Sequence, residues 1–354
     1  MNNVDRILQD QINSNATPGV QYYFFNRESV IHSFVGGFAD VGNRLKTTAD
    51  TTYHAFSCTK TFTALAILQL EEKGKLRIED SVKKYLPDMP FSAGVTIQHL
   101  LTHSAGIANP IPLSWIHLKQ EHEAFDRDKF FKPMLSNAHI KHEPNEKFAY
   151  SNLGYVLLGN VIEHVAGVSY EEYVTENILS KLGINPAQLG FLINDDAQHA
   201  KGYVKRYSFL NLMLTFLIDK SKYMGGAEGE WKPFKDYYVN GVSYGGLIGT
   251  PYAFVKYIQA ILEPQCGLIS DRYKEKMFTE NFTNNNQPTG MCLSWYSGQL
   301  NGEKYFAHAG GGGGFYSEIR IYPKAGVGSV IMFNRTGMTD ERFLNKLDCY
   351  FINK

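Results

Sequence analysis

The sequence contains few cysteines, carries no net charge and has no long apolar run. Four cysteines are scattered over 354 residues without a Cys-x-x-Cys pair, which argues against a zinc ribbon or a dense disulfide framework. Thirty-five basic residues balance thirty-five acidic ones, so the sequence lacks the basic excess that favours binding to nucleic acid or to an anionic membrane. The longest apolar run, residues 209–218, is shorter than the ~20 residues of a spanning helix. We therefore expect a globular protein without a nucleic-acid partner or a membrane span.

The sequence also shows no targeting signal and no cofactor-binding fingerprint. The first residues, Met-Asn-Asn-Val-Asp-Arg, lack a basic stretch followed by an apolar one. Unless a leader has been removed, this predicts a cytoplasmic location. The glycine run 310–314 lacks the Gly-Lys-Ser/Thr of a phosphate-binding loop and fits no dinucleotide fingerprint. We predict no cofactor and no metal, and the oligomeric state stays open.

Hydrophobic periodicity places strands at both ends of the chain and helices between them. Helical spacing of apolar residues predicts helices over 4–12, 57–73, 96–101, 153–165, 170–182, 251–261 and 341–351. Alternating apolar residues predict strands over 20–25, 29–35, 293–296, 305–308, 317–322 and 329–333. The short links between neighbouring strands favour antiparallel pairing. The predicted fold class is α+β (an α/β sandwich): one antiparallel sheet from both chain ends, flanked by helices, with a mainly helical inserted domain.

This pattern divides the chain into two predicted domains. Residues 1–80 plus 265–354 form the sheet-containing α/β domain, and residues 81–264 form the mainly helical domain. Two long irregular segments of the helical domain, 109–147 and 200–238, are expected to form lids over a pocket, since such segments often carry specificity. The second contains the apolar run described above. That run is interpreted either as a wall for an acyl or aromatic substrate group, or as ordinary core or a dimer contact.

The clearest local signal is Ser57-Cys-Thr-Lys60, a Ser-x-x-Lys motif where a buried apolar helix begins. Side chains three residues apart share one helix face, with Cβ atoms about 5–6 Å apart. A serine hydroxyl needs a base to become a good nucleophile, and burial lowers the pKa of a lysine so that it can serve as that base. The Ser57 N–H group at the helix start can face a developing oxyanion. Taken alone, the motif has a second interpretation, an N-cap serine followed by a surface lysine.

Two further segments join this motif. Phe148-Ala-Tyr150-Ser-Asn152 precedes an apolar helix, and Ala307-His308-Ala-Gly310-Gly311 ends a predicted strand. Together with Ser57-x-x-Lys60, they resemble in order and spacing the serine β-lactamase and penicillin-binding protein superfamily. Tyrosine at position 150 is similar to the branch of class C β-lactamases, D-alanyl-D-alanine carboxypeptidases and family VIII esterases. The resemblance extends over most of the chain.

The resemblance implies a role for each matching residue. Ser57 would be acylated, and Lys60 and Tyr150 would share the transfer of its proton. Asn152 would bind the carbonyl side of the substrate and help to orient Lys60. The backbone N–H groups of Ser57 and Gly311 would form the oxyanion hole, in which one donor is typically worth ~100–1,000-fold in rate.

The third motif departs from the β-lactamase pattern at His308, where those enzymes usually carry lysine. The resemblance assigns His308 and Gly310 to substrate binding. A histidine with an ordinary pKa near 6.5 is mostly neutral at pH 7, so it attracts a substrate carboxylate less strongly than lysine does. Ala309 in place of threonine also removes a hydroxyl that could bind that carboxylate. We therefore expect ester, amide or peptide substrates without an obligatory carboxylate, and weak β-lactamase activity at most.

Two local patterns suggest competing sites. His103-Ser104-Ala-Gly106 resembles a nucleophile elbow, but its first glycine is missing and its flanks predict a helix followed by a loop. His99 and His103 have the spacing of zinc-protease ligands, but Leu100 stands where the catalytic glutamate belongs. We expect neither pattern to be functional.

Two functional hypotheses follow from these observations. The first is a serine hydrolase that forms an acyl-enzyme at Ser57 and acts on a small ester, amide or peptide, as an esterase or a D-peptidase/amidase. The second is a catalytically inactive, penicillin-binding-like protein that binds peptide or acyl ligands.

Overall fold

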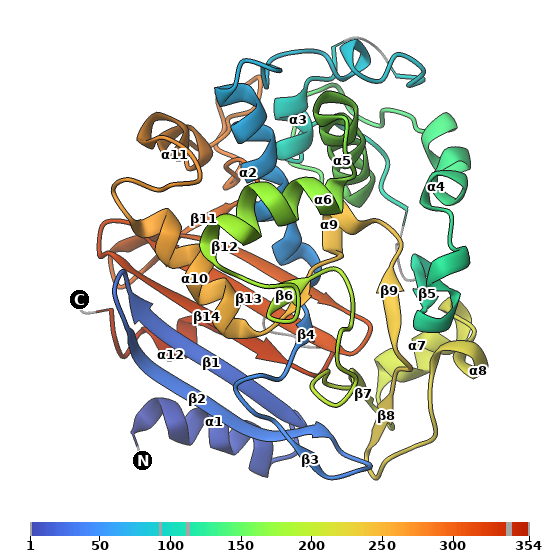
Figure 1. Cartoon of the computed structure of the whole chain (residues 1–354), viewed down its shortest axis with the longest axis vertical. Coiled ribbons are helices and arrows are strands. Elements are labelled where there is room, and N and C mark those ends of the chain that lie inside the picture. Colours follow the sequence, from blue (N-terminus) through green and yellow to red (C-terminus); the bar gives the residue numbers. More distant parts are fainter. Residues whose placement is uncertain (1, 92–93, 111–113, 338–341, 353–354) are drawn as a thin grey trace.

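The computed structural model describes residues 2–91, 94–110, 114–337 and 342–352, and within them it contains a seven-stranded antiparallel sheet (Figure 1). In spatial order the strands are β11 (Tyr296–Leu300), β12 (Glu303–Gly312), β13 (Phe315–Tyr322), β14 (Val327–Phe333), β1 (Gly19–Asn26), β2 (Val30–Asp40) and β3 (Leu45–Lys46). The N-terminal β1 pairs with the C-terminal β14, with Val20 opposite Phe333. The predicted assembly of one sheet from both chain ends is confirmed.

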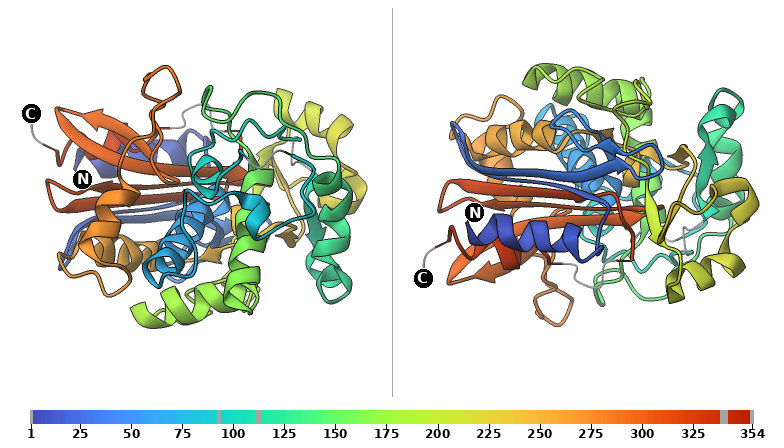
Figure 2. Two further views of the ribbon diagram at one scale, coloured as in Figure 1. Left: turned by 90° about the horizontal axis from the view of Figure 1, so that it is seen from above. Right: turned by 90° about the horizontal axis from the view of Figure 1, so that it is seen from below.

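Helices cover both faces of this sheet. On one face lies α1 (Asn3–Asn13), and on the other lie α2 (Thr59–Glu72) and α10 (Pro251–Leu262) (Figure 2). Tyr22 and Phe24 of β1 belong to the core beneath α1, whereas Tyr23 and Phe25 belong to the core that contains α2 and α10. This alternation is the period of two that a strand buried on both faces imposes. The predicted α+β fold class is confirmed.

The middle of the chain is mainly helical and also carries short strands. Its helices are α3 (Ile97–Leu101), α4 (Arg127–Ser136), α5 (Asn152–Ala166), α6 (Tyr170–Val174), α7 (Phe209–Leu217), α8 (Lys220–Tyr223) and α9 (Val242–Gly245), and α11 (Asp271–Met277) and α12 (Asn345–Asp348) follow α10. The short strands are β4 (Tyr53–His54), β5 (Ile116–Leu118), β6 (Leu189–Gly190), β7 (Tyr203–Lys205), β8 (Trp231–Pro233), β9 (Tyr237–Val239) and β10 (Ile248–Gly249). Among the described residues, no helix combines the length and apolarity needed to cross a membrane.

Four expectations about local structure need correction. The strand expected over 293–296 starts only at Tyr296, because Ser294 has a positive φ of 70° and Cys292 N–H bonds to Trp295 O in a tight turn. The helix expected over 170–182 is regular only as far as Val174. It continues as a π turn and then a 3-10 turn, so its hydrogen-bond pattern changes twice.

The other two corrections concern a lid segment and the C-terminus. The segment 200–238, expected to be irregular, contains the nine-residue helix α7. The helix expected over 341–351 is much shorter, because α12 is a single helical turn that is followed by hydrogen-bonded turns. Residue 341 lies outside the described residues. The other lid segment, 109–147, contains β5 and α4, and residues 111–113 within it are likewise not described. The two-domain division stays a proposal.

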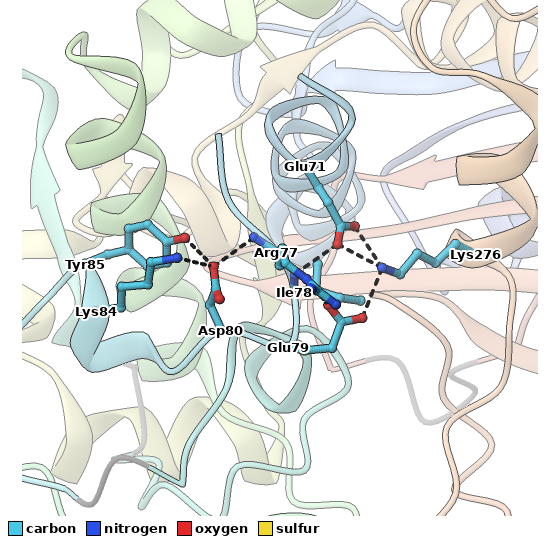
Figure 3. A network of polar contacts seen from close by, with 8 residues as sticks. All are labelled: Glu71, Arg77, Ile78, Glu79, Asp80, Lys84, Tyr85 and Lys276. Atoms are coloured by element: carbon cyan, nitrogen blue, oxygen red, sulfur yellow. Dashed lines mark hydrogen bonds and ion pairs between the residues drawn. The ribbon is translucent and has the colours of Figure 1, made fainter. Parts of the chain in front are cut away.

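A network of polar contacts holds the end of α2 that lies farthest from Ser57 (Figure 3). The nearly buried carboxylate of Glu71 accepts a hydrogen bond from Ile78 N–H and two bonds of 2.9 Å from Lys276. Lys276 belongs to α11, so this ion pair joins two helices 205 residues apart in sequence. Asp80, in the turn after α2, is held separately by Lys84 and by the phenol of Tyr85.

We expect the substitution Lys276→Met to lower the free energy of unfolding by about 1–2 kcal/mol. It leaves a desolvated carboxylate without its cation, although Lys276 is one-third exposed and the loss is therefore smaller than for a fully buried pair. Urea unfolding against the exposed control Lys75→Met measures the difference. Equal midpoints for the two variants would contradict the assignment.

Candidate active site

Ser57 lies in a strained turn between β4 and α2. The turn is the 3-10 segment Phe56–Cys58, and Phe56 has a positive φ of 46°, a conformation that costs a bulky residue about 1–2 kcal/mol. Two contacts to the carbonyl of Ala55 compensate: Cys58 N–H donates to it at 3.2 Å, and the hydroxyl of Ser317 on β13 donates to it at 2.7 Å. The sheet therefore fixes the position of the Ser57 side chain.

Lys60 lies one turn along, inside a helix whose residues 59–71 are all buried. Its Nζ lies 3.0 Å from Ser57 Oγ, 2.9 Å from Asn152 Oδ1 and 2.8 Å from the backbone oxygen of Tyr244. The side chain is fully buried, and this burial lowers the pKa of Lys60 well below its usual value. All three partners are neutral oxygens, so none of them restores the charged form as a carboxylate would.

Tyr150 approaches Ser57 from the other side. Its Oη donates to Ser57 Oγ at 2.8 Å, and its ring centroid lies 5.0 Å from Lys60 Nζ. Burial raises the pKa of Tyr150 well above its usual value, so the phenol keeps its proton. The ring of His103 lies against it, with centroids 4.2 Å apart, and His103 Nδ1 accepts the N–H of Ser151. These contacts fix the direction of the phenol.

Asn152 begins α5, and the local sequence explains why the helix starts there. The hydroxyl of Ser151 caps the helix by accepting Gly154 N–H at 3.1 Å. The N–H of Asn152 donates to Asn109 Oδ1 at 2.9 Å, so the residue is held at its backbone and its amide oxygen.

Strand β12 forms the opposite wall, and Gly310 is where its backbone touches the serine turn. A Cβ at 310 would lie 2.3 Å from Ala55 O and 2.7 Å from Ser57 N, too close for any side chain. A Cβ at Gly311 would meet nothing closer than 3.8 Å. Close packing therefore requires glycine at 310, whereas the free protein has space for a methyl group at 311.

His308 is 1% exposed and lies on the same strand. Its Nδ1 lies 2.9 Å from Ala309 O, and its buried Nε2 has no hydrogen-bond partner among the described residues. Burial, followed by repulsion from Lys60, lowers the pKa of His308 to about 3. The imidazole is therefore uncharged at neutral pH.

Two cavities adjoin this cluster. One, of about 120 Å³, is bordered by Ser57, Asn152 and Gly311. The other, of about 600 Å³, is bordered by Tyr150, His308 and Gly311. Gly311 borders both, so the two cavities meet at the strand beside Ser57.

The structure brings Ser57, Lys60, Tyr150 and Asn152 into direct contact, and it places Gly310 against the serine turn. Of the competing patterns, His103 contacts this cluster through the ring of Tyr150, whereas Ser104 and His99 make other contacts. Ser104 is buried, with its Oγ 2.8 Å from Thr102 Oγ1, and the ring of His99 accepts Thr96 N–H in a helix cap. The described residues contain no group of three or more side chains that could ligate a metal.

Four residues in contact with the cluster had no role in the sequence prediction. Tyr244 supplies a backbone oxygen, Ser317 supports the serine turn, Asn109 holds Asn152, and His103 supports Tyr150. Backbone acceptors carry no side-chain signal in a sequence. The sequence patterns indicate His103 only as part of a zinc-ligand pair and of an elbow-like segment, and give no signal that it contacts Tyr150.

This sheet, its helices and the Ser57 cluster define a protein of the β-lactamase and penicillin-binding class. The family described as "Beta-lactamase" matches residues 4–348. Penicillin-binding protein 4* of Bacillus subtilis is 30% identical over 298 residues, which cover 82% of this chain and 61% of that protein. The chain thus spans about three fifths of the length of this relative.

Solved structures give the same result. The octameric penicillin-binding protein homologue from Pyrococcus abyssi is 28% identical, with a TM-score of 0.77 over 99% of this chain and 77% of that one. The D-amino acid amidase from Ochrobactrum anthropi is 18% identical, with a TM-score of 0.77 over 98% of this chain and 96% of that one, and at that identity it supports the fold alone. The chain belongs to the beta-lactamase family.

The two neighbouring glycines of β12 provide a matched test of this packing. We expect Gly310→Ala to lower the free energy of unfolding by about 1–3 kcal/mol, because its Cβ must displace backbone atoms of the serine turn. Gly311→Ala should change it by about 0.5 kcal/mol or less. Thermal or urea unfolding of both variants measures the contrast, and equal stability would contradict it.

Proposed function

We propose that the protein is a serine hydrolase that forms an acyl-enzyme at Ser57, with an ester or an amide as its substrate. The observation that carries the proposal is the position of one serine oxygen, 3.0 Å from a buried lysine amine and 2.8 Å from a half-buried phenol. The roles given below to Ser57, Lys60, Tyr150, Asn152, His308, Gly310 and Gly311 belong to this proposal.

The contacts of Lys60 suggest the direction of proton transfer. A neutral amine has two N–H groups and one lone pair. Asn152 Oδ1 and Tyr244 O can only accept, so they take the two N–H groups and the lone pair faces the hydroxyl of Ser57. Tyr150 then donates its own proton to Ser57 Oγ. Lys60 is the base in this arrangement, and Tyr150 is a proton donor.

Acylation follows from this network. As Ser57 Oγ forms a bond to the substrate carbonyl carbon, its proton moves to Lys60 and the carbonyl electron pair moves onto oxygen. The backbone N–H groups of Ser57 and Gly311 stabilise that oxyanion. When the bond to the leaving group breaks, Tyr150 protonates the departing oxygen or nitrogen, and the proton held by Lys60 replaces the one that Tyr150 gives up. Attack by water on the acyl-enzyme repeats these steps and releases the acid.

The charge state of His308 affects which substrates the site can bind. With its pKa near 3, its ring has no positive charge at neutral pH to attract a carboxylate. We therefore propose that His308 and Gly310 contact an uncharged part of the substrate, and that penicillin-like substrates, which carry a carboxylate, are hydrolysed slowly.

Labelling with a fluorophosphonate tests the nucleophile. We expect mass spectrometry to find the adduct on Ser57, and we expect Ser57→Ala to abolish both labelling and turnover of p-nitrophenyl butyrate. A protein that is labelled at Ser57 but turns over neither esters, D-alanyl peptides nor nitrocefin would be the inactive binder. An unlabelled Ser57, or a Ser57→Ala variant as active as the parent, would overturn the proposal.

The pH dependence tests the base. Protonation of Lys60 removes its lone pair, so kcat/KM should fall as the pH drops through the lowered pKa of Lys60 and should be fully retained above it, well below the usual lysine value of 10.5. Lys60→Arg keeps the charge but cannot deprotonate, and it should lose about 10²–10⁴-fold in kcat/KM. A pH–rate profile of both proteins measures this. Parent-like rates in Lys60→Arg would exclude Lys60 as the base.

A further inference from the structure

We propose that the acyl part of the substrate is a short, uncharged aliphatic chain that occupies the 120 Å³ cavity beside Ser57, and that helix α7 sets the length of this chain. This inference rests on the proposed acyl-enzyme chemistry and names its substrate class. It arises from the lining of the cavity, its volume and the two faces of α7.

The cavity is lined almost wholly by apolar and aromatic groups. Among the described lining residues, Ser57, Asn152 and Thr336 have polar side chains without an aromatic ring, and none is acidic or basic. The remaining side-chain wall comes from the serine turn, the start of β5, helix α7 with the residue after it, the segment from β8 to β9, and α9. Its residues are Phe56, Trp115, Ile116, Leu210, Leu214, Ile218, Phe234, Val239 and Tyr244.

Helix α7 contributes one face to this cavity and leaves the other exposed. Leu210, Leu214 and the following Ile218 line the cavity at a spacing of four, which places them on one side of the helix. Phe216 on the opposite side is 78% exposed, and Leu212 is 58% exposed. Their exposure argues against ordinary core for the outer residues and leaves the dimer-contact interpretation open. Leu214 belongs to the main hydrophobic core, with Leu210 and Ile218 packed against it, and all three also border the cavity.

Polar contacts at both ends hold α7 in place. Ser208 caps its first turn by accepting Asn211 N–H at 3.1 Å, and the amide of Asn211 donates to Arg206 O at 2.6 Å. After the helix, Lys220 donates to Thr215 Oγ1 at 3.0 Å. Hydrogen bonds therefore fix both ends of the helix that forms this wall of the cavity.

The volume limits the length of the acyl chain. An apolar cavity of about 150 Å³ in a protein core holds one benzene ring. The cavity beside Ser57 is about 120 Å³, so it suits a group slightly smaller than a benzene ring. An acyl group of roughly four to six carbons meets that limit. An acetyl group contacts only a small part of the apolar wall, and chains of more than about six carbons must displace α7.

The described part of the lining carries no charged residue, which disfavours charged acyl groups. A buried ammonium or carboxylate without a partner loses its hydration and gains nothing in return. An α-amino acyl group, as in an amino acid amide, would place its ammonium beside Lys60 and inside this apolar wall. Among the ester and amide substrates proposed above, this favours esters of simple aliphatic acids.

A series of p-nitrophenyl esters from acetate to dodecanoate tests the inference in the full chain. We expect kcat/KM of the parent to be highest at butyrate or hexanoate and at least tenfold lower at decanoate. Leu214→Ala enlarges the cavity and should move the maximum to longer chains, and Leu214→Phe should move it to a shorter chain than in the parent. Leu212→Ala, two residues away on the exposed face, is the matched control and should keep the parent profile.

Three results separate this inference from the proposed function. If Ser57 is labelled by fluorophosphonate and esters are hydrolysed, but Leu214→Ala and Leu212→Ala give one profile, the inference is wrong and the serine hydrolase stands. Faster turnover of D-phenylalanine amide than of p-nitrophenyl butyrate would also overturn it. If neither labelling nor ester turnover occurs, both proposals fail. Should Leu214→Ala not fold, Leu210→Ala, which removes a half-buried side chain of the same wall, carries the same prediction.

Discussion

The burial of one lysine amine among neutral oxygens is the constraint on which the rest of the site depends. A buried lysine is ordinarily paired with a carboxylate, which restores its charged form. Lys60 instead has an amide oxygen, a backbone oxygen and the hydroxyl of Ser57 as partners, so its pKa falls. Such an arrangement requires a helix that is apolar all round, and α2 supplies it by packing against α5, α9 and α11 at the centre of the larger core.

The sheet serves this constraint by bringing distant segments together. β12 and β13 press against the serine turn: the Ser317 hydroxyl binds the Ala55 carbonyl, and Gly310 allows the two backbones to touch. Phe56 keeps its strained positive φ because these contacts from the sheet fix the backbone conformation of the turn. Antiparallel order makes this possible, since the tight link between β12 and β13 keeps both strands beside the same turn. The site is therefore a property of the whole sheet.

The sequence was sufficient for the parts whose signal is local. Ser57 and Lys60 share a helix face at a spacing of three, and strands of alternating character gave the sheet its antiparallel order. The sequence was insufficient where the cause is tertiary. Every residue has a backbone carbonyl, so only the tertiary fold shows that the carbonyl of Tyr244 accepts a hydrogen bond from Lys60. The positive φ of Ser294, which shortens β11, has no signal in residue propensities. The helical period of α7 was hidden because its apolar residues surround the whole helix.

Electrostatics connects the base to the proposed choice of substrate. A carboxylate close to Lys60 would favour the ammonium and raise the pKa of Lys60, removing the free amine on which the proposed mechanism depends. An ammonium in the same place would be repelled while Lys60 is charged, and it would be desolvated throughout the reaction. The proposed base, an amine without a carboxylate partner, is therefore compatible with the neutral substrates proposed above. The uncharged ring of His308 and the apolar cavity closed by α7 meet this requirement on the two sides of Ser57.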